Sequence, residues 1–314
     1  MNGYEISRGD CLRNPKSNPI RENEIERLTS IKVASQHLSL LRSGLPRRIP
    51  GELFARNLVG RRTLIFQLVK RDFQQRYVGS VAGWMWGVIH PLVLLASYTF
   101  IFTVCMKQQL GPGEVTQNYP LFLFAGMLPW LLFSETVQRS SGSLVEQANL
   151  ITKTVFPAEI MPVAIFLSSL MSHLLALGLV IGAVGVWLHH FSPAVLMLPA
   201  LMLLVGMFAV GVGWITSSLQ VYLRDTAQVV MVGLTFWFWL TPIFIPDARY
   251  PARFRFLLDL NPLAYVVRDY RLMLLGNAPP PMRDLLAAGA FAVAAFVVGG
   301  LFFRRLKRGF GDVL

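Results

Sequence analysis

Long apolar runs separated by short polar breaks fill most of the chain after residue 83. Six of these runs have about the length of a membrane span, for which about 20 apolar residues are needed. They cover residues 84–106, 121–137, 161–188, 195–221, 228–245 and 285–303. The pattern therefore predicts an all-α integral membrane protein with six transmembrane helices.

The segment before the first run, Arg61–Tyr77, has a different pattern. Apolar residues recur there at helical spacing, namely Ile65, Leu68, Val69, Phe73 and Tyr77. Charged and amide side chains occupy much of the remainder, namely Arg62, Lys70, Arg71, Gln74 and Arg76. A basic amphipathic helix beside a span lies in the headgroup layer with its apolar side toward the lipid. The pattern therefore predicts an N-terminal amphipathic interface helix.

The distribution of basic residues predicts the orientation of the spans. Residues 1–58 hold four prolines, mixed charges and few aromatic residues, which predicts a largely disordered extension before the membrane domain at 59–314. Six spans place both termini on one side, which then carries 22 Lys and Arg residues against 7 on the other. Because cytoplasmic segments hold the basic excess, both termini are predicted to be cytoplasmic.

The segment between the second and third runs is polar but keeps apolar side chains. Ser141 or Ser143 can cap a short helix there, and Glu146 lies near its N-terminal end, where a negative charge is favoured. The apolar residues of this segment are Leu144, Val145, Leu150, Ile151, Val155 and Phe156. A solvated loop has little need for them, so we expect this segment to dock onto a partner.

The segment between the fifth and sixth runs, Pro246–Asp284, contains two short apolar elements. Asn261 can cap a helix whose first residue is Pro262, and the shorter element Phe254–Leu260 precedes it. We expect two short re-entrant helices that dip into the outer leaflet. Non-helical turns at that depth need protein or water around them, so the element is expected to line a pathway.

Aromatic residues gather at the ends of the runs and in the fifth run. Most such residues in membrane proteins form interfacial belts, but aromatic faces also suit a sliding sugar chain. The channel-lining candidates are Trp84, Trp86, Tyr98, Tyr119, Trp130, Phe133, Trp237 and Trp239. Trp237 and Trp239 cannot face the same side of a helix, so at most part of this set can line a channel. In the third run, Gly178 and Gly182 are four residues apart, a spacing that permits close helix packing.

Composition and motifs exclude several kinds of chemistry. The chain is 54% hydrophobic and 15% charged with a net charge of +12, and its basic residues flank the apolar runs, which argues against nucleic-acid binding. A P-loop is absent from the sequence, so ATP is not expected to bind here. Scattered histidines and two distant cysteines predict neither a metal nor a cofactor site. His173 in the third run is better explained by a hydrogen bond to a neighbouring helix than by a functional role. Glu135 near the inner end of the second run is the one acidic candidate for a proton-driven carrier, and capping or pairing at the interface explains it equally well.

Five stretches together resemble the membrane permease subunit of type-2 ABC exporters for surface polysaccharide, as in O-antigen and teichoic-acid export. They are KRDFQQRYVGSVAGWMWGVIHPL (Lys70–Leu92), YPLFLFAGMLPWLLFSE (Tyr119–Glu135), ANLITKTVFPAEIMP (Ala148–Pro162), YLRD (Tyr222–Asp225) and NPLAYVVRDYR (Asn261–Arg271). The resemblance covers about residues 60–310. It implies a homodimer of six-span subunits in the bacterial inner membrane, paired with two copies of a separate ATPase that binds ATP and Mg²⁺.

The resemblance also implies roles for individual residues. The ATPase would push a coupling helix within residues 143–154 and a second inner turn, through Glu146, Asn149, Leu150, Lys153, Arg224 and Asp225. The interface helix would contribute Lys70, Arg71, Phe73, Arg76 and Tyr77. The substrate would be a polysaccharide linked to undecaprenyl diphosphate. Candidates for an outer gate or a diphosphate contact are Arg253, Arg255, Asp259, Tyr265, Arg268, Asp269 and Arg271, although pairing of the arginines with Asp259 and Asp269 is the simpler role.

Two other functions compete with this one. The first is export of a drug or small lipid by the same class of transporter. The second is a membrane-embedded polysaccharide enzyme, which would need acidic residues that converge near the outer face. Asp247, Asp259 and Asp269 are the candidates for that role, and each has an arginine nearby in sequence.

Overall fold

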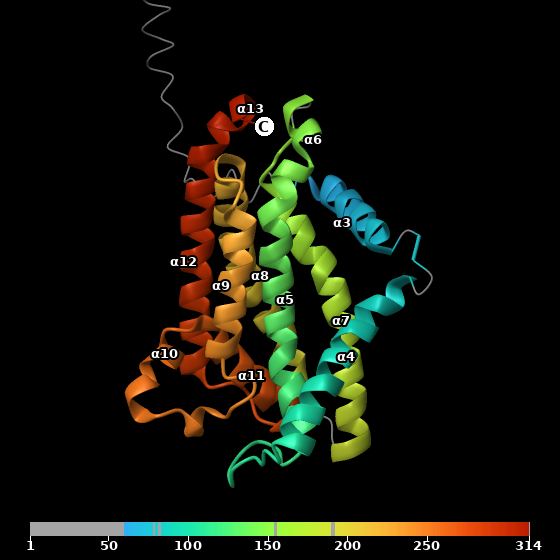
Figure 1. Ribbon diagram of the computed structural model, residues 1–314, viewed down its shortest axis with the longest axis vertical. Helices are drawn as coiled ribbons and strands as arrows, with labels where there is room; N and C mark the ends of the chain where they lie inside the picture. The colour runs from blue at the N-terminus through green and yellow to red at the C-terminus, as the bar shows by residue number, and fades with distance from the viewer. Residues whose placement is uncertain (1–59, 78, 81–82, 154–155, 190–191, 314) are drawn as a thin grey trace, which may run out of the picture. The chain divides into compact units, whose positions relative to one another are not determined.

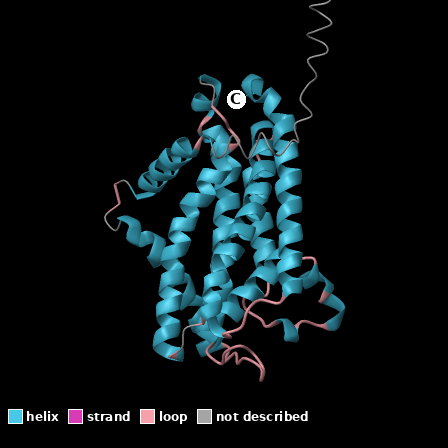
Figure 2. Ribbon diagram, turned by 180° about the vertical axis from the view of Figure 1, so that it is seen from behind, coloured by secondary structure: helices cyan, strands magenta, loops and turns pink. Residues whose placement is uncertain are grey.

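A computed structural model describes residues 60–77, 79–80, 83–153, 156–189 and 192–313. The predicted extension 1–58 and Thr154 lie outside these residues. Every regular element in the described residues is a helix, as Figure 2 shows. The all-α prediction is therefore confirmed for this part of the chain.

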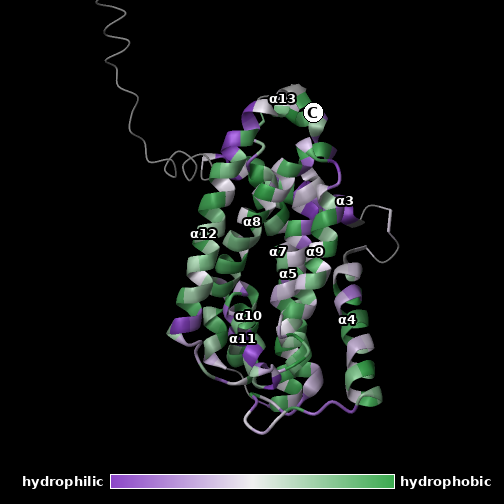
Figure 3. Cartoon of the chain, turned by 60° about the vertical axis from the view of Figure 1, so that its left-hand side comes forward, coloured by the Kyte–Doolittle hydropathy of each residue, from purple (hydrophilic) through white to green (hydrophobic). Residues whose placement is uncertain are grey.

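Five helical stretches are long and apolar enough to cross a membrane. They are Trp86–Cys105, Tyr119–Glu146, Ile160–Leu188, Pro193–Tyr222 and Met282–Gly309. Their main helices are α4 (Trp86–Thr99, continued by a π-helical turn, Phe100–Cys105), α5 (Tyr119–Glu146), α7 (Ile160–Leu188), α8 (Leu198–Tyr222) and α12 (Met282–Leu306). Figure 3 shows the hydrophobic residues along these helices, with hydrophilic ones toward the ends of α12.

The fifth predicted span corresponds to α9 (Thr226–Leu240), which is apolar but has 15 residues. At 1.5 Å per residue it rises about 22 Å, less than the roughly 30 Å of a typical hydrocarbon core. A count of six spans therefore stays a prediction, while five are supported by length and composition.

Helix α5 lies at the centre of the packing. It contacts α7 and α8, and α8 in turn contacts α12 (Figure 1). In the most apolar window of α5, 78% of the residues are buried, against 6% in α4. Helix α4 thus leaves most of its surface open to lipid or to another chain.

The end of α5 corrects the prediction for the second span. Ser141 and Ser143 do not cap a helix, because α5 continues through both to Glu146. Their hydroxyls donate to backbone carbonyl groups one turn earlier, at Gln138 (2.6 Å) and Ser140 (2.8 Å). Since both serines are buried and satisfied within α5, the polar residues here do not end the helix. The predicted coupling helix is the separate, six-residue α6 (Ala148–Lys153).

The segment after α9 folds into short helices. They are η4 (Asp247–Arg249), η5 (Ala252–Phe254), α10 (Phe256–Asp259) and α11 (Pro262–Leu275). Asn261 caps α11 as predicted, since its side-chain oxygen accepts from the Leu263 N–H at 3.1 Å. Twelve of the 14 residues of α11 are buried, and α11 packs against α5 and α12. Whether α10 and α11 re-enter a membrane stays a prediction.

Candidate functional site

Three segments meet at one end of the bundle, which we call the α6 end (Figure 1). They are α6, the connection between α8 and α9, and the short C-terminal helix α13 (Phe310–Val313), which contacts both α6 and α8. The exposed residues here form what we call the tip surface, made of Val145, Glu146, Asn149, Leu223, Arg224 and Asp225. The fold thus brings the predicted coupling residues of both inner segments to the same end. Leu150 is half-buried there, and the side chain of Lys153 is not described.

The tip surface combines charge with exposed apolar groups. Val145 is 45% exposed and Leu223 is 61% exposed, beside the charged Glu146, Arg224 and Asp225. Exposed apolar side chains rimmed by charges are typical of a protein-binding surface.

Residues at and just after the C-terminal end of α12 contact both the segment between α6 and α7 and the end of α8. These contacts were not predicted from the sequence. The Tyr222 hydroxyl donates to the Leu306 carbonyl at 2.9 Å, and the Tyr222 ring lies 6.2 Å from that of Phe310. The Lys307 ammonium lies 2.5 Å from a carboxylate oxygen of Glu159, between α6 and α7. The aromatic residue of the YLRD stretch was the available signal for this contact.

The predicted interface helix is α3 (Arg62–Tyr77). Ile65 and Leu68 are buried, and α3 packs against α7. Lys70 and Arg71 are exposed, and Arg71 donates to the Gln147 side-chain oxygen at 3.0 Å, which ties α3 to the start of α6. Phe73 is half-buried, and the side chain of Tyr77 is not described.

Arg76 corrects the assignment of α3's polar side. Arg76 was expected on the polar side of a helix in the headgroup layer, but its guanidinium turns into the bundle and lies 2.5 Å from a Glu135 oxygen on α5. Arg139 on α5 pairs with Asp72 on α3 at 2.5 Å. We call these four residues the α3–α5 ion network. Its geometry confirms that Glu135 is paired, because a carboxylate facing the bundle without a cation would be costly.

The α3–α5 ion network affects the acidity of Asp72. Burial by itself raises the pKa of this carboxyl. The hydrogen bond from Arg139 and the positive charges of Arg139 and Arg76 outweigh burial, so the pKa lies below its ordinary value. Asp72 is therefore ionised at neutral pH, and the network holds two cations and two anions.

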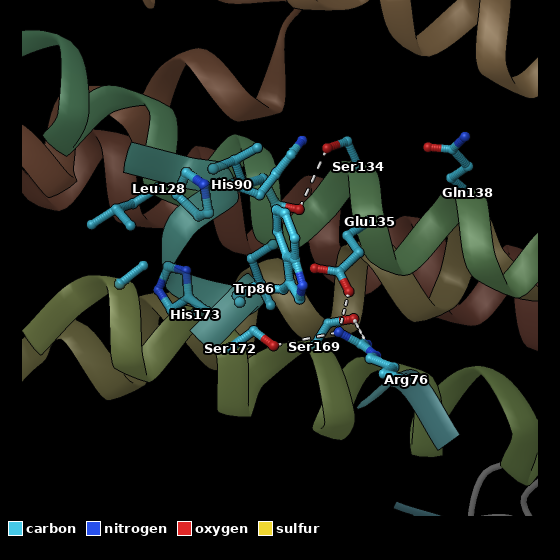
Figure 4. Close-up of a pocket in the computed structure, with 15 residues that line it drawn as sticks. Arg76, Trp86, His90, Leu128, Ser134, Glu135, Gln138, Ser169, Ser172 and His173 are labelled. Atoms are coloured by element: carbon cyan, nitrogen blue, oxygen red, sulfur yellow. Dashed lines mark hydrogen bonds and ion pairs between the residues drawn. The ribbon is translucent and has the colours of Figure 1, made fainter. Parts of the chain in front are cut away.

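A cavity of about 570 Å³ lies beside the α3–α5 ion network, between α4, α5 and α7 (Figure 4). Arg76 and Glu135 lie toward one end, and His90, Leu128 and His173 toward the other. Trp86 is the one predicted channel-lining residue among the residues that line it.

Most of the other channel-lining candidates pack into the interior of this chain. Phe133 lies 5.1 Å from the ring of Phe208 and 5.2 Å from that of Trp237, and Trp130 contacts Trp237 at 6.5 Å. The Trp237 N–H donates to the Asn261 side-chain oxygen at 2.9 Å. These rings join α5, α8 and α9, and a lumen-facing role for them stays a prediction.

The remaining aromatic candidates differ in exposure. Tyr119 is buried and its hydroxyl donates to the Phe244 carbonyl at 3.0 Å, while Tyr98 packs edge-on against the Phe244 ring. Trp86 and Trp239 are more than half exposed, and the side chain of Trp84 is not described. Trp237 and Trp239 thus face different surroundings, as the helical spacing requires.

The outer-gate candidates lie at the opposite end of the bundle, which we call the α11 end (Figure 1). Arg268 pairs with Asp247 at 2.6 Å and with Asp284 at 2.9 Å. Arg271 is buried and donates to three backbone carbonyl groups. The predicted pairing of these two arginines with Asp259 and Asp269 is therefore wrong.

Sequence neighbours are not the spatial partners of Arg268, because the fold brings Asp247 of η4 and Asp284 of α12 to its guanidinium. Among the other candidates, Arg253 and Arg255 are exposed, as is Asp259. The Tyr265 hydroxyl donates to the Asp259 carbonyl at 2.9 Å.

His173 is explained by contact with a neighbouring helix, as expected. Its ring lies 3.2 Å from the Tyr270 hydroxyl on α11. Among the described residues, no group of three or more His, Cys, Asp or Glu side chains could hold a metal ion.

Asp269 is fully buried on α11, and in the described residues neither of its carboxylate oxygens accepts a hydrogen bond. Burial, followed by the negative charge of Asp284, raises the pKa of Asp269 to about 7, although Arg268 acts in the opposite direction. The folded chain therefore keeps this proton at pH values where an unfolded chain, with a pKa of 3.8, has lost it.

We expect stability to fall as pH rises from about 4 to about 7, because the folded state binds more protons than the unfolded state there. The slope contributed by Asp269 approaches about 1.4 kcal/mol per pH unit. Melting temperatures measured from pH 4 to 8 should show this decline in the wild-type protein, and Asp269→Asn should flatten it. The exposed Asp259→Asn variant is the control and should keep the decline. An unchanged slope in Asp269→Asn would contradict the assignment.

Comparison with known proteins agrees with these features. Residues 63–275 match the family described as ABC-2 type transporter. An O-antigen export system permease protein RfbA of Myxococcus xanthus is 29% identical over 262 residues, which are 82% of this chain and 97% of that protein. A protein of the same name from Klebsiella pneumoniae is 28% identical over 253 residues, which are 80% of this chain and 95% of that protein.

The resemblance inferred from the five sequence stretches is thus confirmed. The relatives are permeases, and the chain is a membrane subunit rather than an enzyme. Its match to the family extends from α3 to the end of α11 and so includes the tip surface. The chain belongs to the ABC-2 type transporter family.

Proposed function

We propose that the chain is the permease subunit of an exporter that moves O-antigen-like polysaccharide, linked to undecaprenyl diphosphate, across the bacterial inner membrane. The observation that carries this proposal is the tip surface, where α6 and the α8–α9 connection present exposed apolar and charged groups at one end of the bundle. The names of the relatives support the substrate class.

The partner at the tip surface is a separate ATPase, present in two copies, that binds ATP with Mg²⁺. Both termini face the cytoplasm, and two copies of the permease form the channel between them. When the ATPase pair closes, it pushes α6 and the α8–α9 connection. The contacts Glu159–Lys307 and Tyr222–Leu306 join both connections to the last residue of α12 and the residue that follows it, so the push reaches the bundle as a whole.

The rest of the chain guides the polymer. Exposed rings such as Trp86 and Trp239 face the second copy or the channel, where aromatic surfaces let sugars slide. At the α11 end the exposed Arg253 and Arg255 contact the leaving substrate. The paired Arg268 and the buried Arg271 hold the gate segment in place.

A double charge reversal, Glu146→Lys with Arg224→Glu, tests the proposal. Both side chains are exposed at the tip surface, and the exchange leaves the net charge of the permease unchanged. We expect co-purification of the ATPase to fall about tenfold or more, since mismatched charges at an interface cost several kcal/mol. Lipid-linked polymer should then accumulate on the cytoplasmic side of the membrane.

The matched control is Asp259→Lys with Arg283→Glu, which makes the same exchange at exposed positions of the α11 end. It should leave ATPase binding unchanged. Normal ATPase binding by the Glu146/Arg224 variant would place the docking surface elsewhere. A strain without the permease that fails to make any polymer would contradict export as the function.

A further inference from the structure

The cavity between α4, α5 and α7 has the dimensions of a ligand site. Its volume of about 570 Å³ lies within the roughly 300–1,000 Å³ typical of such sites. On α5 its lining runs from Leu128 to Gln138, which lie ten positions apart and so are separated by about 15 Å along the helix. Trp86 lines it and is 53% exposed, so the cavity opens at the surface beside α4.

The lining changes character along that length. Toward the α6 end it is polar, with Arg76, Glu135 and Gln138 beside two serines of α7. Toward the middle of the spans it is mostly aliphatic, with contributions from Pro91, Leu128, Leu131, Leu132 and Ala176, together with the imidazole rings of His90 and His173. A site inside the spans with its charged groups at one end and mostly aliphatic groups at the other fits a molecule with the same division, namely a membrane lipid.

The polar end keeps hydrogen-bonding capacity for such a headgroup. Arg76 donates to the hydroxyl oxygens of Ser169 (3.1 Å) and Ser172 (3.4 Å). Because these oxygens accept from Arg76, their own O–H groups are oriented to donate elsewhere. The Arg76 Nε atom, by contrast, is buried beside an Asp72 oxygen at 3.6 Å, so it is not among the groups that a headgroup can reach.

The charges around the cavity indicate which net charge a bound headgroup should carry. Arg76 and Arg139 are balanced by Asp72 and Glu135, so the α3–α5 ion network is neutral as a whole. A diphosphate group would bring about two negative charges next to two carboxylates. A zwitterionic headgroup adds no net charge, and it places a phosphate by Arg76 and a cation by Glu135.

We propose that this cavity binds a bilayer phospholipid with a phosphoethanolamine headgroup, and not the exported lipid-linked substrate. The phosphate accepts from Arg76, Ser169 and Ser172. The primary ammonium donates to Glu135 and to the Gln138 side-chain oxygen, using up to three N–H groups. One acyl chain follows the apolar wall of α5, and the lipid fills the gap that the sparse packing of α4 leaves. The inference rests on the membrane placement of α4, α5 and α7, and it stands whatever substrate is exported.

Native mass spectrometry of the full-length permease, purified with its ATPase, tests the proposal. The detergent-solubilised complex is titrated separately with phosphatidylethanolamine, phosphatidylcholine and phosphatidylglycerol. We expect phosphatidylethanolamine to be retained about tenfold more than the other two, because the quaternary ammonium of choline has no N–H to donate and glycerol has no cation. Glu135→Gln should remove this preference, and Arg283→Gln, an exposed charge at the α11 end, should leave it unchanged.

Two further variants separate the site from the ion network. Ala176→Leu narrows the apolar part without touching a charged residue, and Leu131→Phe does the same from α5 if the first variant does not fold. Either should lower retention of phosphatidylethanolamine about tenfold at an unchanged melting temperature. Equal retention of the three lipids, or full retention by a cavity-narrowing variant, would overturn the proposal. Preferred retention of phosphatidylglycerol would also overturn the proposal, since that result would show that the site selects an anionic headgroup.

Discussion

Replacing Arg271 with methionine is expected to destabilise the α11 end of the bundle by at least about 3 kcal/mol, because three buried carbonyl groups lose their donors at about 1–3 kcal/mol each. The guanidinium donates to the carbonyl oxygens of Phe122 (3.1 Å), Pro242 (2.7 Å) and Ile243 (2.6 Å). It also lies 3.5 Å from the centre of the Phe122 ring. Methionine fills similar space and offers no hydrogen bond.

The position of these carbonyl groups explains the size of the effect. Phe122 belongs to the first turns of α5, whereas Pro242 and Ile243 follow the end of α9 at Thr241. All three residues are buried, so water cannot replace the lost donors. Arg271 of α11 therefore joins three segments that would otherwise bury unpaired backbone groups. Lysine should not rescue the loss, because its single ammonium cannot match the planar, forked geometry of a guanidinium.

The measurement is the melting temperature of the purified protein at a fixed heating rate, since membrane proteins of this size often unfold irreversibly. Arg253→Met is the matched control. That arginine is exposed and stacks on Phe254 at 4.7 Å, a contact that contributes about 0.5–1 kcal/mol. A melting temperature of Arg271→Met no lower than that of Arg253→Met would refute the structural role assigned to Arg271.

Hydropathy and the capping signal at Asn261 predicted the long helices of this fold and the start of α11. The apolar runs correspond to α4, α5, α7, α8, α9 and α12, and Asn261 marks the start of α11 as predicted. These signals are local, because a helix interior and a cap depend on residues within a few positions. The same reasoning ended the second span at 137, since it could not foresee that α8 would bury the serines that follow.

The partners of the charged residues could not be predicted in the same way. Arg76 and Arg271 were recognised as candidates, but their partners lie far away in the sequence. Arg76 pairs with Glu135, which is 59 positions later, and Arg271 binds the carbonyl group of Phe122, which is 149 positions earlier. Arg271 also binds backbone carbonyl groups, which every residue carries and no sequence pattern marks. Spatial pairing of this kind depends on the packing of whole helices, so the sequence identified the residue types and left their partners open.

The glycines show most clearly that sequence spacing alone does not tell where two helices pack closely. Gly178 and Gly182 have the four-residue spacing that permits close helix packing, yet a Cβ atom at either position would meet nothing within 4 Å. Both glycines lie on an exposed side of α7 in the described residues, so the close packing that their spacing permits is not made within this chain. The close approach occurs instead between Gly211 of α8 and Gly299 of α12, where a Cβ on Gly299 would overlap the Gly211 carbonyl group.

Gly299→Ala is therefore expected to destabilise the protein by about 1–3 kcal/mol or more, the usual cost of overpacking a filled interior. The clash is with backbone atoms, so no flexible side chain can move aside and α8 and α12 must separate along their contact. Gly182→Ala is the matched control, since its new methyl group meets open space and alanine favours a helix over glycine by roughly 0.5–1 kcal/mol. Melting temperatures should thus fall for Gly299→Ala and stay equal or rise for Gly182→Ala. If both variants melt alike, the contact between α8 and α12 is looser than the structure shows, and the small residues of α8 do not set the distance between the two helices.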